Sequence, residues 1–163
     1  MNLSNGGMIR DRLDSLNLSL PRAPISSGLY APVVISGKLV FLSGQLPIEQ
    51  GTNSSNVKYK GKVGKDISID DGKNAARLCT LNGLSQLEVA LGSLDKIHKF
   101  LRVSGFVNCE ASFTEHSKVM DAASDLILQV FAEKGKHTRI ALGMNSLPLN
   151  GAVEIDYILE KED

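Results

Sequence analysis

The chain has 163 residues, of which 42% are hydrophobic and 22% are charged, and its formal net charge is zero. The length suits one globular domain, and the composition excludes a disordered chain. A zero net charge argues against a protein that binds nucleic acid through bulk charge. There is no apolar run of about 18 residues and no signal-peptide pattern in residues 1–22, so we expect a cytoplasmic protein without membrane spans.

The residues that most often bind metals are few and scattered. Cys79 and Cys109 are the only cysteines and lack CxxC spacing, while His98, His116 and His137 fall in three different predicted elements. This distribution predicts two reduced thiols, no metal site and no bound cofactor.

The first part of the chain predicts a short helix and a linker. Ile9, Leu13 and Leu16 repeat at helical spacing, and prolines at 21 and 24 end the helix. We therefore assign residues 1–28 to a leading helix with its linker, and residues 29–163 to the main domain.

Three strands and a loop are expected next. Apolar runs at 31–35 and 39–43 surround a Ser-Gly-Lys turn and predict a hairpin. Residues 49–56 are polar and read as a loop. Residues 57–63 alternate lysine with apolar or small residues, which is typical of an edge strand protected by charge.

Two long helices follow, each introduced by a capping-box pattern. Ser68 with Asp71 opens a run with leucines at spacings of three or four as far as Leu91. Ser112 with Glu115 is predicted to open the second helix in the same way.

The remaining segments, 97–107, 137–144 and 152–159, alternate as strands do. Two helices with one apolar stripe each can cover one face of the resulting six-stranded sheet, which gives a two-layer α+β fold. The central strands are apolar on both faces, as at Phe41. Oligomerisation through the sheet would bury the second face.

The last third of the chain carries the candidate site. Arg139 shares one strand face with the small residues Ala141 and Gly143, and Glu154 points away from the apolar face of the final strand. A fixed cation beside open space, with a carboxylate nearby, suits a small carboxylate substrate. The alternative is a solvated salt bridge between paired strands.

The chain also resembles a known family. The run from Gly37 to Pro47 contains a Ser-Gly-Gln strand similar to that of the reactive-intermediate deaminases (RidA/YjgF, older label endoribonuclease L-PSP). Arg139, Leu147-Pro148 and Glu154 match the family's C-terminal signature. The resemblance runs from about residue 30 to 159. The leading helix and the 49–66 insertion resemble a poorly characterised branch of the family.

The resemblance implies a chorismate-mutase-like fold and a homotrimer whose sheets form a barrel with three intersubunit clefts. It implies hydrolysis of enamine or imine intermediates, such as 2-aminoacrylate, to 2-oxo acids and ammonia. Arg139 would hold the carboxylate through two parallel bonds, and Glu154 would orient water and move its proton. Tyr30 and Gly44 would contact the substrate, and Ser43 would do so or bond backbone instead.

Two positions depart from the family pattern. Ala141 stands where family deaminases usually have cysteine, and Ser117 where they often have asparagine on the second helix. Two alternatives therefore remain: a non-catalytic trimer that binds small carboxylates or a protein, and an endoribonuclease. The second would rely on the only basic run that could hold RNA, which is Lys58, Lys60, Lys62 and Lys65.

Overall fold

The computed structural model describes residues 8–24, 28–49 and 56–163. Residues 50–55 of the predicted 49–56 loop and residues 25–27 of the predicted linker lie outside these ranges. The described elements are α1 (Met8–Ser15), β1 (Val33–Ser36), β2 (Leu39–Gln45), α2 (Ile69–Leu91), η1 (Leu94–Lys96), β3 (Ile97–Asn108), α3 (His116–Phe131), η2 (Ala132–Gly135), β4 (Thr138–Met144), η3 (Pro148–Asn150) and β5 (Val153–Lys161).

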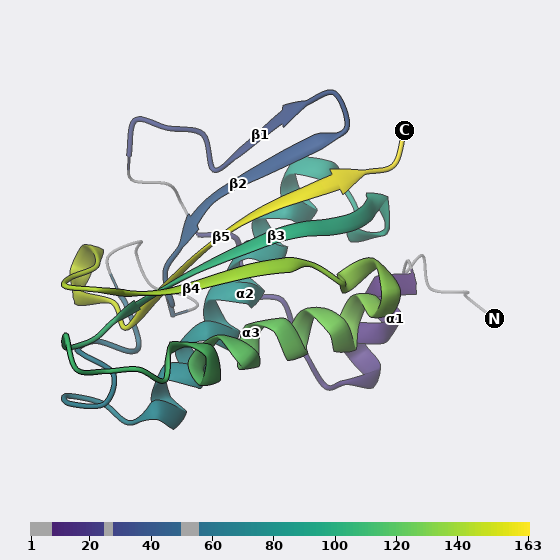
Figure 1. The fold of residues 1–163 in the computed structure, drawn as a ribbon. Helices are drawn as coiled ribbons and strands as arrows, with labels where there is room; N and C mark the ends of the chain where they lie inside the picture. The colour runs from purple at the N-terminus through teal and green to yellow at the C-terminus, as the bar shows by residue number, and fades with distance from the viewer. Residues whose placement is uncertain (1–7, 25–27, 50–55) are drawn as a thin grey trace.

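One mixed sheet with the strand order β1-β2-β5-β3-β4 forms the first layer (Figure 1). All neighbours are antiparallel except β3 and β4, which are parallel and are joined through α3. A parallel pair needs such a crossover, and the helix supplies it. The last strand in sequence, β5, pairs with β2 on one side and β3 on the other and lies at the centre of the sheet.

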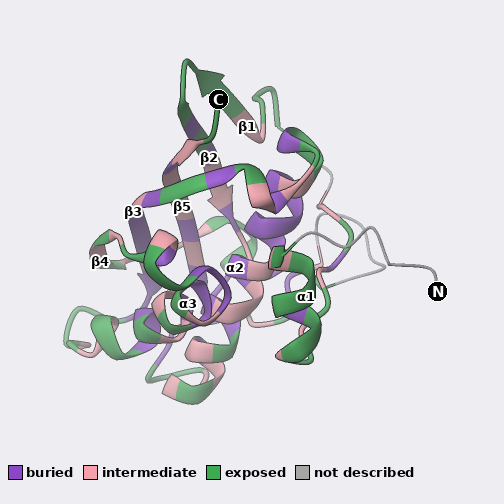
Figure 2. Cartoon of the chain, turned by 90° about the vertical axis from the view of Figure 1, so that its right-hand side faces the viewer, coloured by how far each residue is buried: buried purple, intermediate pink, exposed green. Residues whose placement is uncertain are grey.

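Helices α2 and α3 form the second layer, on one face of the sheet (Figure 1). The strand residues that face them are almost fully buried (Figure 2). The interior that they share with the helices is apolar. This core includes Val40, Leu42, Phe100, Val103, Val107, Val153, Ile155, Tyr157 and Leu159. The two-layer α+β prediction is therefore confirmed.

The sheet has five strands in the described residues, so the predicted sixth strand at 57–63 is wrong. Val57, Lys60 and Val63 make only isolated bridges to other segments. Gly61 has φ 110°, a backbone conformation that interrupts an extended run. Lys62 does not project into solvent as an edge lysine would, because its Nζ bonds the Cys109 carbonyl oxygen at 3.0 Å.

The two predicted helix starts have different outcomes. At α2 the capping box is present: Ser68 Oγ accepts from the Asp71 N–H at 3.0 Å, and the Asp71 carboxylate accepts from the Ser68 N–H. The second capping box is wrong. α3 begins at His116 after Glu115, which forms no side-chain cap, because its carboxylate pairs with Lys118.

The leading helix α1 packs against the domain through Leu13, which is 1% exposed, and through the partly buried Ile9. The Ile9 N–H donates to Asp95 Oδ1 of η1 at 2.9 Å, and Arg12 Nε donates to the Gln129 carbonyl oxygen of α3 at 2.8 Å. α1 is thus tied to the end of the molecule where α3 finishes.

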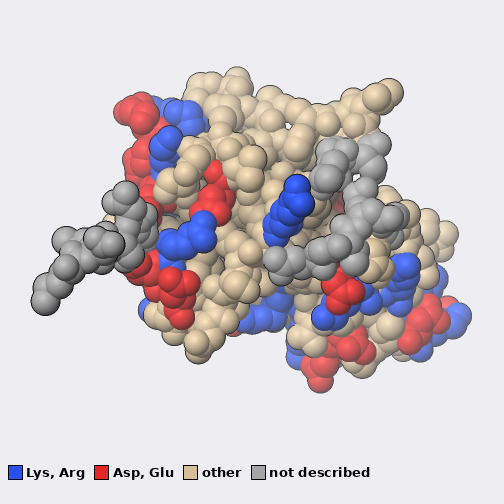
Figure 3. Space-filling model, turned by 180° about the vertical axis from the view of Figure 1, so that it is seen from behind, with Lys and Arg blue, Asp and Glu red and all other residues tan. Residues whose placement is uncertain are grey.

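The sheet face opposite the helices is apolar and partly open. Val34, Leu39, Phe41 and Leu142 expose between 39% and 52% of their surfaces. The region around the β1–β2 hairpin is largely free of charged side chains in the view from behind (Figure 3). Exposed apolar surface of this kind is typical of an interaction surface.

Candidate functional site

Arg139 and Glu154 lie on opposite faces of the sheet, with β3 between their strands. Arg139 is paired with Val103 of β3, and Val103 with Tyr157 of β5, whose side chain faces the helices. Glu154 is paired with Phe106, three residues along each strand from the Val103–Tyr157 pair. Its side chain therefore points to the opposite face of the sheet. The predicted closeness of the cation and the carboxylate is therefore wrong within one chain, and β4 and β5 are not paired with each other.

The side chain of Arg139 reaches α3. Its Nη1 donates to Asp121 Oδ1 at 2.9 Å and to Ser124 Oγ at 3.0 Å. His137 contacts the same serine, with Nε2 2.9 Å from Ser124 Oγ, and its Nδ1 lies 2.6 Å from the Gly135 carbonyl oxygen. The guanidinium is thus part of a side-chain network between β4 and the middle of α3.

Glu154 lies over a β-bulge in β2. Ser43 and Gly44 occupy the bulge, where three steps along β2 match two along β5. A Cβ added to Gly44 would be 2.3 Å from Glu154 Oε1, so only glycine leaves room for this carboxylate. Burial, and then the nearby charge of Asp156, raise the pKa of Glu154.

The Ser43 hydroxyl bonds backbone. It donates to the Ala31 carbonyl oxygen at 2.8 Å, and the Ser43 N–H donates to the Pro32 carbonyl oxygen at 2.9 Å. Both bonds connect the bulge to the residues just before β1. An N–H or O–H group of a ligand could still donate to Ser43 Oγ, since the hydroxyl acts here only as a donor.

The other predicted site residues belong to three different parts of the fold. Tyr30 is 57% exposed in the segment before β1, close in sequence to the partners of the bulge. Ser117 is exposed in the first turn of α3. Ala141 is paired with Gly105 and packs partly against the core, on the same face as Arg139.

The open space expected beside Gly143 is filled by the chain itself. A Cβ there would be 2.5 Å from His116 Nε2 and 2.9 Å from Cys109 Sγ. These two atoms are 3.4 Å apart, and burial raises the pKa of the Cys109 thiol. A cavity of about 340 Å³ adjoins them, lined by Cys109, Glu110, Ala111, Phe113, His116, Gly143, Met144 and Asn145.

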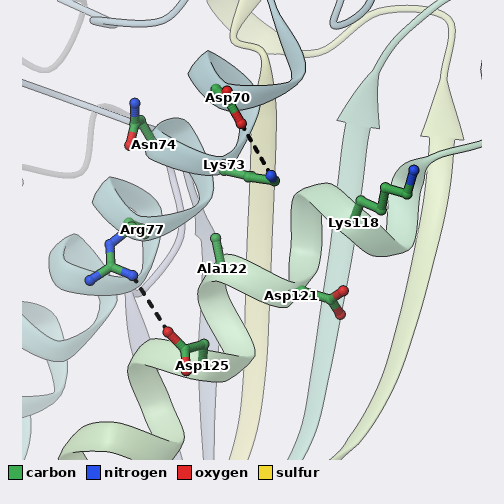
Figure 4. Close-up of a pocket in the computed structure, with 8 residues that line it drawn as sticks. All are labelled: Asp70, Lys73, Asn74, Arg77, Lys118, Asp121, Ala122 and Asp125. Carbon is green, nitrogen blue, oxygen red and sulfur yellow. Dashed lines mark hydrogen bonds and ion pairs between the residues drawn. The ribbon is translucent and has the colours of Figure 1, made fainter.

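A wider groove of about 530 Å³ runs between α2 and α3 (Figure 4). Three basic and three acidic side chains line it, and they largely pair with one another. Lys73 Nζ lies 3.1 Å from Asp70 Oδ1, and Arg77 Nη1 lies 3.8 Å from Asp125 Oδ2. Because its charges balance, the groove offers no net attraction for a carboxylate.

Within the described ranges, no group of three or more His, Cys, Asp or Glu side chains is arranged to hold a metal ion. No helix of the described part is both long and apolar enough to cross a bilayer.

Sequence reasoning missed the partners of Arg139. Asp121 and Ser124 are three residues apart, which places them on one face of a helix, so their common direction was readable. Which strand that face meets depends on the parallel placement of β4 beside β3, and no local pattern encodes this placement. The contacts of His116 and His137 were missed for the same reason.

An α+β sandwich with this order of strands is a chorismate-mutase-like fold, and the comparisons with known proteins agree. Residues 10–161 match the family model described as "YjgF/chorismate_mutase-like, putative endoribonuclease". The chain belongs to this YjgF/chorismate mutase-like family, also called RidA/L-PSP.

Relatives with the same fold cover nearly all of the chain. It is 38% identical to Protein TCP17 of Trypanosoma cruzi over 161 residues, which is 98% of each protein. It is 42% identical to Atu1372 of Agrobacterium tumefaciens, a protein of unknown function, with a TM-score of 0.86 over 95% of this chain and 93% of that one. The structure of E. coli TdcF with bound serine is 22% identical, with a TM-score of 0.59 over 86% and 94% of the two chains, and shows the common fold.

Proposed function

We propose that this protein hydrolyses small enamine or imine intermediates of the 2-aminoacrylate type to 2-oxo acids and ammonia. The observation that carries the proposal is the state of Glu154, a half-buried carboxylate with a raised pKa, held over the Gly44 bulge. A carboxylate so placed, with its pKa raised by burial, is suited to accept a proton from water and return it.

The steps require no metal. The substrate's carboxylate binds Arg139 through two N–H···O bonds, which fixes the adjacent imine carbon. Glu154 orients a water molecule and takes its proton as the water oxygen bonds to that carbon. The imine nitrogen takes a proton from solvent water in the same step, which gives a carbinolamine. Glu154 then passes its proton to the amine and accepts the proton of the hydroxyl group as the C–N bond breaks and the C=O bond forms, so ammonia and a 2-oxo acid leave. Glu154 returns that proton to solvent and is again ionised.

The site would be formed by two copies of the chain, because one sheet separates Arg139 from Glu154. The apolar face that carries Phe41 and Leu142 supports such an assembly, and a homotrimer is the form we propose. Each cleft would then combine Arg139 of one copy with the bulge and Glu154 of the next. Serine, bound in the TdcF structure, has the carboxylate that this arrangement needs.

A non-catalytic carboxylate-binding trimer is the second candidate, and it is favoured by Ala141 and Ser117, which lack the groups that family deaminases use there. An RNA-cleaving role has less support. Lys62 and Lys65 are engaged with the Cys109 carbonyl and with Glu110, respectively, so the basic run does not present a free row of charge.

The deciding assay follows ammonia and 2-oxo acid release from enzymatically generated 2-aminoacrylate. We expect clear turnover by the wild type, with losses of about a hundredfold or more in Arg139→Ala and Glu154→Gln. Arg77→Lys is a matched control, since Arg77 also faces an α3 aspartate but lies in the groove. Release no faster than the uncatalysed reaction would leave the binding module as the function.

A further inference from the structure

We infer that Ser124 and Asp121 are positioning residues that turn one edge of the Arg139 guanidinium toward a ligand carboxylate. The inference rests on the proposed function for the identity of the ligand, but the orientation it assigns to Arg139 can be measured without any ligand.

The bonds to α3 all use one nitrogen. Nη1 makes the bonds to Asp121 and Ser124, whereas Nε and Nη2 form no hydrogen bond with any residue in the described ranges. Nη1 is the nitrogen on the same side as Cδ, so Nε–H and one Nη2–H point in parallel on the other side. This pair is the two-donor fork that matches a carboxylate. α3 therefore holds the guanidinium by the nitrogen that the fork does not need.

His137 makes the network directional. The Gly135 carbonyl oxygen can only accept, so Nδ1 of His137 donates to it, and in the tautomer with its single proton on Nδ1 the Nε2 atom is an acceptor. Ser124 then donates its hydroxyl proton to Nε2 and keeps its lone pairs for Nη1–H of Arg139. Each donor in this series of hydrogen bonds, from Arg139 Nη1 to the Gly135 carbonyl oxygen, meets an acceptor. The series favours one orientation of the serine and one of the arginine.

The contribution of the network is orientation rather than stability. The side chain of Asp121 is 67% exposed and that of Arg139 21%, and ion pairs at such sites contribute little to folding. Asp121 also turns away from α2, unlike Asp125, which points to Arg77 (Figure 4). Within the described ranges, the ion pair of Asp121 is with Arg139, which lies outside the groove.

The test separates orientation from charge. Asp121→Asn keeps an oxygen acceptor but removes the charge, whereas Asp121→Ala and Ser124→Ala each remove an acceptor. Asp125→Ala is the control on the same helix, since Asp125 bonds Gln129 and lies near Arg77 but has no contact with Arg139. All variants are compared as full-length protein with and without 2-oxobutanoate.

Without ligand, the ¹⁵N–¹H spectrum of the Arg139 side chain reports rotation about its C–N bonds. We expect restricted rotation in the wild type, Asp121→Asn and Asp125→Ala, and faster rotation in Ser124→Ala combined with Asp121→Ala. An unchanged spectrum in that double variant would overturn the positioning role, whatever the protein binds.

With ligand, the double alanine variant should bind 2-oxobutanoate about tenfold more weakly, and Asp121→Asn within about threefold of the wild type. In an Arg139→Lys background, which lacks the fork, Ser124→Ala should change the dissociation constant by less than about twofold. Equal losses in both backgrounds would contradict action through Arg139. Restricted rotation in a wild type that binds no 2-oxobutanoate would overturn the proposed substrate class and leave the orientation supported.

Discussion

Glu154 Oε1 occupies the space where a side chain at Gly44 would begin, 2.3 Å from the position of its Cβ. The bulge and the carboxylate are therefore one unit: the extra residue in β2 makes the recess, and glycine keeps it open.

The first prediction follows from this contact. Gly44→Ala should displace Glu154 and lower turnover by at least about tenfold, because a misplaced proton acceptor loses its alignment with water. Stability should fall by less than about 1 kcal/mol, since the end of a flexible side chain can move. Urea unfolding and the ammonia assay check the two effects. In a Glu154→Gln background, Gly44→Ala should cost no further turnover.

The second prediction concerns pH. The pKa of Glu154 is raised in the folded protein above its ordinary value of about 4.5. The native state therefore keeps its proton where the unfolded chain has lost it, and wild-type stability falls as pH rises through this window. Glu154→Gln does not titrate. With the free energy of unfolding of each protein taken relative to its own value at pH 4, the wild type should lose stability against Glu154→Gln as the pH rises above about 4.5. The difference should level off once Glu154 is ionised in the folded state as well, as measured by urea denaturation at each pH.

The third prediction tests the assembly. Phe41→Glu and Leu142→Glu place a charge on the open sheet face, where these residues are 40% and 43% exposed. If this face is buried between copies, each change should convert a trimer into monomers and abolish turnover. Val89→Glu is the control, because Val89 is 73% exposed on α2. If sedimentation velocity shows that the wild type is a monomer at micromolar concentration, the proposals of a trimer and of a site shared between copies are wrong.

The fourth prediction concerns Lys62. Its Nζ bonds the carbonyl oxygens of Cys109 at 3.0 Å and of Asn145 at 2.5 Å, which ties the 57–67 segment to the ends of β3 and β4. Lys62→Met should therefore lower the free energy of unfolding by about 1–3 kcal/mol. Lys60→Ala, at an exposed position nearby, should change it by less than about 0.5 kcal/mol. Similar values for the two variants would mean that the bonds of Lys62 contribute nothing.

Local signals in the sequence were sufficient for the helices and for the faces of single strands. The Ser68 cap, the burial of Val153 and Ile155, and the opposite parity of Glu154 all follow from spacing. The relation between Arg139 and Glu154 does not, because β3 enters between β4 and β5 through a parallel pairing. Periodicity assigns a residue to a face of its own strand, but it says nothing about the order of strands.

The segment at 57–63 shows a second limit. Alternation of lysines with apolar residues predicted a strand, but Gly61 takes a positive φ and Lys62 finds backbone acceptors inside the molecule. A pattern of alternating polarity cannot distinguish a lysine that meets solvent from one that binds carbonyl oxygens across a turn.

The central place of β5 has a consequence for synthesis on the ribosome. β2 and β3 meet only through β5, so the β1–β2 hairpin and the β3–α3–β4 unit have no shared strand until residues 153–161 have emerged. A nascent chain stalled before that point exposes two unfinished sheet edges, which are prone to wrong pairing. Chaperones that cover strand edges would therefore be needed most during translation of the final third of this domain.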